Sequence, residues 1–97
     1  MYNVYYYIDE KDKCTLDKFI GDLKSSNKEK VYAWISKLEE KGPLLPRPYA
    51  DILRDGIHEL RIKLSGDQVR ILYFFIYQEN IILTHKFVKN TDKVPNK

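Results

Sequence analysis

Cysteine and long apolar segments are what this sequence of 97 residues lacks most. Its single cysteine, Cys14, can neither close an internal disulfide nor assemble a cysteine-based metal site. The longest apolar run, residues 71–77, is far shorter than the ~20 residues that span a bilayer. The beginning of the chain also lacks the basic, apolar and small-residue order of a signal peptide. We therefore expect a cytoplasmic protein that is neither secreted nor inserted in a membrane.

A strong excess of one charge is also absent, because 17 lysines and arginines stand against 14 acidic residues. Any case for nucleic-acid binding must therefore rest on where the charges lie. After Glu59 the basic residues outnumber the acidic ones, so the C-terminal part is the basic part. With 43% hydrophobic and 32% charged residues, the chain is too apolar and varied to be disordered, and its length predicts one domain over residues 1–97.

Motifs for cofactor chemistry are missing as well. The sequence contains no metal-ligand cluster, no glycine-rich phosphate loop and no Ser/His/Asp set at a diagnostic spacing. We therefore expect neither a metal nor another cofactor.

The N-terminal half predicts one strand followed by two helices. Residues 2–8 are aromatic and β-branched, as is typical of a strand. Apolar residues then recur at helical spacing over 16–23 and again over 31–38, and Gly42 with Pro43 ends the second run. The two runs indicate a helical hairpin.

The C-terminal half predicts an antiparallel meander. Prolines and Gly56 indicate an irregular loop over residues 43–56, and the period then changes to two in a strand over 57–64. Two further strands follow over 69–77 and 81–88, with a polar tail from Asn90. Since 69–77 is apolar almost throughout, we expect a central strand covered on both faces. The fold class is therefore α+β: an N-terminal strand and a helical hairpin packed on a C-terminal antiparallel sheet, with the first strand at a sheet edge.

Basic residues on these strands are the candidates for function. Pairing between antiparallel strands can bring together the positions that begin and end neighbouring strands. A basic face formed in this way suits a phosphodiester, because arginine offers a forked set of donors and lysine a point charge. RNA is the ligand that we expect there. The candidates are Arg61, Lys63, Arg70, His85, Lys86 and Lys89.

Each candidate also has a purely structural interpretation. Glu59 can pair with Arg61 or Lys63, and Arg70 must either reach solvent at the strand end or be paired. His85 lies between Leu83 and Phe87 on one predicted strand face, where it could be a histidine at the core margin or a general acid or base. Lys86 and Lys89 can simply solubilise a strand end. Most tyrosines favour packing, although Tyr73 could stack on a base.

The segment LRDGIHELRIKLSGDQVRILYFFIYQENIILTHKFVKNTDKVP, which covers nearly half the chain, resembles a known toxin family. Its motifs are a dGl-ELR strand start at residues 55–61, a yRilYff strand at 69–75 and an LlH-FvKkT-k-P ending at 83–95. In order and spacing it is similar to the HigB-like, phage-derived branch of the RelE/ParE superfamily. One departure is Asn90, which stands where a second lysine of the KK pair is common.

The resemblance implies a RelE-like fold and the toxin of a type II toxin–antitoxin system. Such a toxin is usually a ribosome-dependent endoribonuclease that cleaves mRNA without a metal, by attack of a ribose 2′-hydroxyl on the adjacent phosphate. It implies phosphate binding and transition-state stabilisation by Arg61 and Arg70, and acid or base catalysis by His85 with Lys63 as a second candidate for that task. It also implies that Lys86, as a catalytic residue, and Lys89 hold the RNA or neutralise the leaving group.

The implied partners are the ribosome, its mRNA and a cognate antitoxin, expected to be a helix-turn-helix protein. DNA would be contacted only through the antitoxin, since nothing in this chain reads as a recognition helix. The alternative within the same superfamily is a non-catalytic toxin of the ParE kind that inhibits DNA gyrase.

Overall fold

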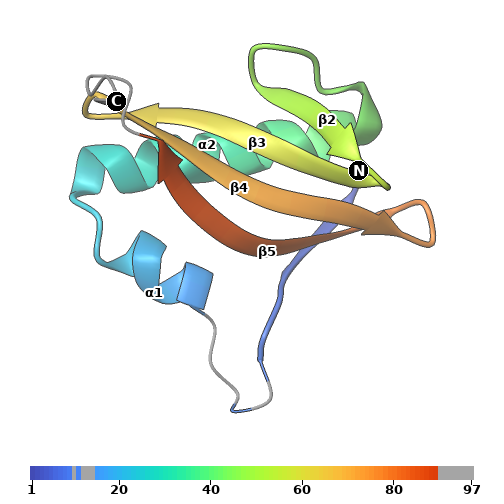
Figure 1. Cartoon of the computed structure of the whole chain (residues 1–97), viewed down its shortest axis with the longest axis horizontal. Helices are drawn as coiled ribbons and strands as arrows, with labels where there is room; N and C mark the ends of the chain where they lie inside the picture. The colour runs from blue at the N-terminus through green and yellow to red at the C-terminus, as the bar shows by residue number, and fades with distance from the viewer. Residues whose placement is uncertain (10, 12–14, 90–97) are drawn as a thin grey trace, which may run out of the picture.

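A computed structural model describes residues 1–9, 11 and 15–89 of the chain, so Cys14 and the predicted tail from Asn90 lie outside the described residues. The elements follow in the order strand, two helices, a short 3-10 turn and four strands (Figure 1). Their bounds are β1 Asn3–Tyr6, α1 Thr15–Gly21, α2 Ser25–Lys41, η1 Gly42–Leu44, β2 Ala50–Arg54, β3 Ile57–Leu64, β4 Asp67–Ile76 and β5 Asn80–Lys89. The α+β class and the helical hairpin predicted from the sequence are confirmed.

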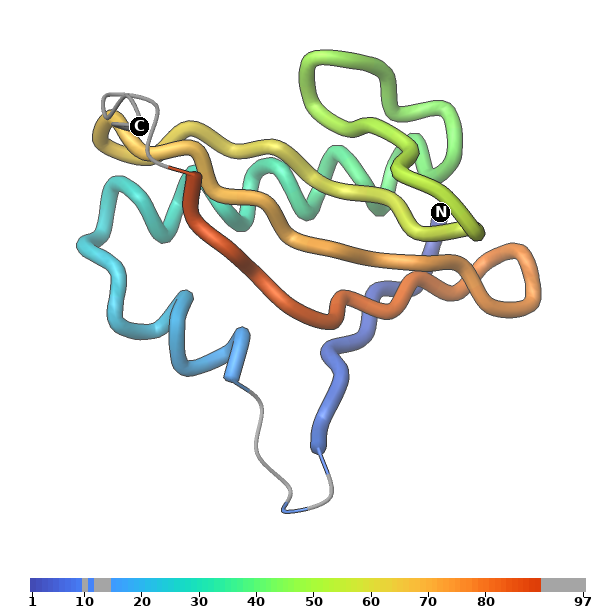
Figure 2. Tube along the Cα trace, viewed as in Figure 1, coloured from blue at the N-terminus to red at the C-terminus, as the bar shows by residue number. Residues whose placement is uncertain are grey.

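The five strands form one sheet in the order β1-β5-β4-β3-β2. Strands β2 to β5 pair antiparallel, whereas β1 pairs parallel with β5 at the edge. The predicted central position of β4 and the edge position of the first strand are both confirmed. Figure 2 shows the N-terminal segment running beside the C-terminal strand. Strand β1 therefore forms one edge of the sheet, and β5 is its neighbour.

The helices cover only one face of this sheet (Figure 1). Apolar residues of both helices pack there against the inward side chains of β3, β4 and β5. The fully buried side chains are Leu16, Ile20, Val31, Leu38, Leu60, Ile62, Ile71, Tyr73, Ile81 and Leu83. No helix within the described ranges is long and apolar enough to cross a membrane.

Two predictions from the sequence are wrong. Residues 43–56 are not wholly a loop, because they contain η1 and the edge strand β2, whose Ala50 pairs with Leu60. Cross-strand hydrogen bonds to β3 order this segment despite its prolines. Strand β4 is not covered on both faces either: Val69, Ile71 and Tyr73 are buried toward the helices, while the residues between them are only partly covered.

Candidate functional site

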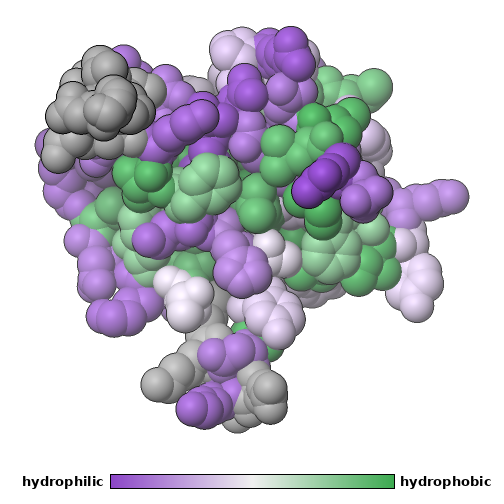
Figure 3. Space-filling view, viewed as in Figure 1, coloured by the Kyte–Doolittle hydropathy of each residue, from purple (hydrophilic) through white to green (hydrophobic). Residues whose placement is uncertain are grey.

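The face of the sheet that carries no helix is here called the open face, and it mixes hydrophilic and hydrophobic side chains (Figure 3). It carries the strand residues that alternate with the buried ones. Cross-strand register defines its rows. Arg61 of β3 lies directly opposite Arg70 of β4, which in turn lies opposite Phe87 of β5. The next row joins Lys63, Gln68 and Lys89. The structure thus brings together four of the residues proposed from sequence: Arg61, Arg70, Lys63 and Lys89.

Arg61 and Arg70 belong to a connected set of ion pairs, which is here called the arginine cluster. Glu59 accepts from Arg61 Nε at 2.8 Å and from Arg70 Nη1 at 2.7 Å through the same carboxylate oxygen. Arg61 Nη2 also reaches Asp51 at 3.1 Å, and Asp51 pairs with Arg47 at 2.9 Å. These five residues are the cluster. Of the two structural interpretations of Arg70, pairing is the one that the fold adopts.

Burial differs sharply along the cluster. The Glu59 side chain is only 4% exposed and Arg70 12% exposed, whereas Arg61 is 34% exposed. A buried carboxylate is tolerated only when it is paired, so Glu59 and Arg70 depend on each other. Arg61 has the most exposed side chain of this trio and is therefore the member best able to meet a ligand.

Electrostatics leave the cluster with a small positive balance, since three arginines face two carboxylates. The Arg47 guanidinium beside Asp51, together with the backbone N–H of Ile52, lowers the pKa of that carboxyl. Asp51 therefore stays ionised at neutral pH and keeps orienting Arg61. The arrangement fixes an arginine fork on an open sheet face, which is a geometry suited to an oxyanion such as a phosphate.

A β-bulge in β5 separates the other proposed residues from the cluster. Ile71 pairs with Lys86 but Tyr73 pairs with Leu83, so two residues of β5 lie opposite Leu72. The strand changes phase at this point. Lys86 consequently lies on the helix-covered side, with Nζ 4.8 Å from the ring centroid of Phe19.

The bulge also corrects the predicted surroundings of His85. Leu83 is buried, while His85 and Phe87 are exposed, so the three do not share one buried face. The His85 ring stacks near Tyr7, which follows β1, with centroids 6.4 Å apart. Neither His85 nor Lys86 contacts the arginines through any hydrogen bond or ion pair found among the described residues.

Tyr73, proposed as an RNA contact, is 1% exposed and belongs to the core. Burial raises the pKa of Tyr73 to about 12, so the phenol stays protonated. Its ring stacks with His58 at 5.1 Å between centroids. An RNA base could reach it only by opening the core.

Sequence reasoning underrated two residues. From the sequence, Glu59 was expected only as a possible ion-pair partner of Arg61 or Lys63. In the structure its buried carboxylate binds both Arg61 and Arg70. Phe87, assigned to the core side, is 44% exposed on the open face opposite Arg70. The alternation of side chains along β3 and β4 could have indicated that Glu59 lies on the face of the arginines. The exposed position of Phe87 follows only from the β-bulge in β5.

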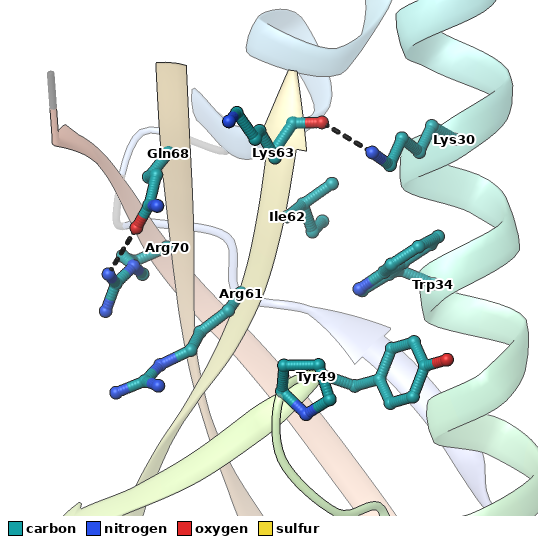
Figure 4. Close-up of a pocket in the computed structure, with 9 residues that line it drawn as sticks. Lys30, Trp34, Tyr49, Arg61, Ile62, Lys63, Gln68 and Arg70 are labelled. Atoms are coloured by element: carbon teal, nitrogen blue, oxygen red, sulfur yellow. Dashed lines mark hydrogen bonds between the residues drawn. The ribbon is translucent and has the colours of Figure 1, made fainter. Parts of the chain in front are cut away.

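A cleft of about 280 Å³ adjoins the cluster where α2 faces β3 (Figure 4). Residues from α2, β3, β4 and the segment before β2 line it: Lys30, Trp34, Pro48, Tyr49, Arg61, Ile62, Lys63, Gln68 and Arg70. It contains four cationic side chains and no carboxylate among these lining residues. Within the described ranges, no group of three or more His, Cys, Asp or Glu residues could hold a metal ion.

A mostly antiparallel sheet with helices on one face and the arginine cluster on the other defines a small α+β protein suited to an anionic ligand. The family described as "Phage derived protein Gp49-like (DUF891)" matches residues 18–97, and the chain belongs to this family. The family is associated with RelE-like and toxin-like proteins, so membership supports a toxin-like function. No curated protein matches the chain.

Proposed function

We propose that this protein is the HigB-like toxin of a type II toxin–antitoxin system and that it cleaves mRNA on the ribosome. One observation carries the proposal: Arg61 and Arg70 lie opposite each other on an open sheet face and share a buried carboxylate. Membership of a phage-derived, toxin-associated family supports it. The RelE-like fold supports it further.

The reaction would be a transesterification within the RNA. The ribose 2′-oxygen forms a bond to the adjacent phosphorus, the bond from phosphorus to the 5′-oxygen breaks, and the proton lost by the 2′-hydroxyl is balanced by one gained at the leaving oxygen. Arg61 would bind the phosphate and offset the charge that builds up on the phosphorane. Arg70 would act through Glu59 as a positioning residue. Lys63, in register beside them, is the ammonium group that we assign to the leaving oxygen.

The RNA would run over the rows that flank the arginines. Lys89 lies in the row of Lys63 and would contact the RNA backbone. Phe87 offers an exposed ring beside Arg70 for stacking. His85 and Lys86 lie apart from this track, so we assign them no place in the cleavage step.

The proposed partners are the ribosome with its mRNA and a cognate antitoxin with a helix-turn-helix domain. The antitoxin would neutralise the toxin in the cytoplasm and supply all DNA contacts of the complex. The toxin itself would use neither a metal nor another cofactor.

A second candidate function is non-catalytic inhibition of DNA gyrase, as in ParE-like toxins. One observation favours it: the carboxylates of Glu59 and Asp51 occupy much of the hydrogen-bonding capacity of Arg61. A face of this kind could bind a protein without acting on RNA.

Induced expression in bacteria separates these functions. We would express the wild type, Arg61→Gln and Arg54→Gln, and map mRNA ends by primer extension within minutes of induction. Arg54 is an exposed arginine of β2 outside the arginine cluster, which makes it a matched control. New ends with the wild type and Arg54→Gln, but not with Arg61→Gln, would support the nuclease. Growth arrest with intact mRNA and a DNA-damage response would favour gyrase inhibition.

A further inference from the structure

Beyond Leu60, one edge of strand β3 is covered by no strand among the described residues. Strand β2 pairs with β3 only as far as Leu60, yet β3 continues to Leu64. The main-chain N–H of Arg61 still donates to Tyr49 O at 2.8 Å, which is the last main-chain contact found on this side. The cleft beside α2 begins at this point.

Aromatic rings and lysines form the wall of this cleft. The rings of Trp34 and Tyr49 lie 5.3 Å apart at an angle of 59°. Lys30 Nζ lies 5.1 Å from the Trp34 centroid. Lys37, which does not line the cleft, places its Nζ 5.2 Å from the Tyr49 centroid. Flat rings beside ammonium groups are the combination with which proteins hold bases and phosphates of single-stranded nucleic acid.

The indole nitrogen of Trp34 adds an unused donor. It is buried and has no hydrogen-bond partner, and Figure 4 shows it on the side of the ring that faces β3. A buried N–H without an acceptor is costly, so an acceptor that entered the cleft would gain this bond once the ring shifted slightly. Base carbonyl and ring nitrogen atoms are such acceptors.

The cleft is continuous with the proposed RNA track. Arg61, Gln68 and Arg70 line its other end, and Figure 4 shows both guanidinium groups on the side of β3 away from Trp34. An RNA strand that bends around the uncovered edge would therefore place one phosphate at the arginines and the neighbouring nucleotide at Trp34. The volume of about 280 Å³ lies at the low end of ligand sites, which suits a single nucleotide.

A peptide strand is a poorer fit for the same edge. Lys30 Nζ donates to Lys63 O at 2.7 Å and so occupies an acceptor that strand addition would need. A lysine laid on a sheet edge is also a usual protection against such pairing.

From these observations we infer that the cleft between α2 and β3 is a nucleotide subsite, in which Trp34 and Tyr49 contact a base while Lys30 contacts its phosphate. This inference rests on the proposed function, because it extends the RNA bound at the arginine cluster. The occupant is the nucleotide next to the one whose phosphate meets Arg61.

Trp34 is the only tryptophan of the chain and reports on its own site. We would titrate the whole protein with a 2′-O-methyl RNA hexanucleotide, which cannot be cleaved, and follow tryptophan fluorescence. We expect saturable quenching, and we expect Lys30→Gln and Tyr49→Leu to weaken binding by at least about fivefold. Lys41→Gln, at an exposed lysine in the last turn of the same helix, should leave binding unchanged. A circular dichroism melt of each variant confirms that it is folded.

The outcomes separate this inference from the nuclease proposal. Quenching that depends on Lys30, in a protein that leaves mRNA intact, would uphold the subsite and reject the nuclease. Cleavage of mRNA without quenching, or with Lys30→Gln and Lys41→Gln binding equally, would overturn the subsite. Quenching by a glutamate-rich peptide with no response to RNA would also overturn it, in favour of a protein partner.

Discussion

At the scale of single residues, Arg70 has a structural role as well as a proposed functional one. Its ion pair with Glu59 is buried, and removal of one partner leaves a carboxylate that only Arg61 still compensates. We expect Arg70→Ala to lower the free energy of unfolding by about 2–3 kcal/mol, as measured by urea denaturation. The exposed Arg54→Ala should change it by less than about 0.5 kcal/mol.

A double substitution tests the reason for that loss. If the cost comes from the orphaned carboxylate, Glu59→Leu combined with Arg70→Met should be less destabilising than the sum of the two single changes. Additive losses would mean that the pair contributes nothing specific and that packing alone explains Arg70.

His58 should make stability depend on pH. Burial lowers the pKa of His58 below its ordinary value of 6.5. The unfolded chain therefore binds a proton at His58 more tightly than the folded chain does. The contribution of neutral His58 to the free energy of unfolding is complete above about pH 6.5 and is lost as the pH falls through the lower pKa of the folded state. Between about pH 7.5 and pH 5, the thermal midpoint of the wild type should fall more than that of His58→Gln. Parallel curves would contradict the assignment.

At the scale of elements, the end of α2 depends on glycine. Gly42 has a φ of 54°, its N–H donates to Leu38 O, and an added Cβ would collide with the ring of Tyr2. Gly42→Ala should therefore cost about 1–3 kcal/mol in urea denaturation. Gly21, which ends α1, has no atom within 4 Å of an added Cβ, so Gly21→Ala should be neutral or stabilising by up to about 1 kcal/mol. Similar effects of both changes would refute this explanation.

Elements with a clear period were predictable from sequence, and those shaped by their neighbours were not. The apolar spacing of α2 and the alternation of β3 each follow from local chemistry. Strand β2 could not be recognised because its order comes from pairing with β3. The bulge in β5 was equally hidden, and it alone moves Lys86 to the helix side and Phe87 to the open face. Pairing of Glu59 with an arginine was foreseeable, but its burial required the cross-strand register of β3 and β4.

In the molecule as a whole, the two faces of the sheet have different roles. The helices bury one face of the sheet and supply stability, which leaves the other face free to carry the arginine cluster. The cleft beside β3 connects that face with α2, so one continuous surface can follow a nucleic-acid strand. We propose that this surface acts on mRNA through Arg61.

The most direct test adds purified protein to an in vitro translation reaction with one defined mRNA and maps the RNA ends produced. We expect the wild type and Arg54→Gln to create new ends within the translated region, and Arg61→Gln to create none while it melts close to the wild type. Intact mRNA with the wild type, or equal cleavage by Arg61→Gln, would contradict a nuclease that acts through Arg61.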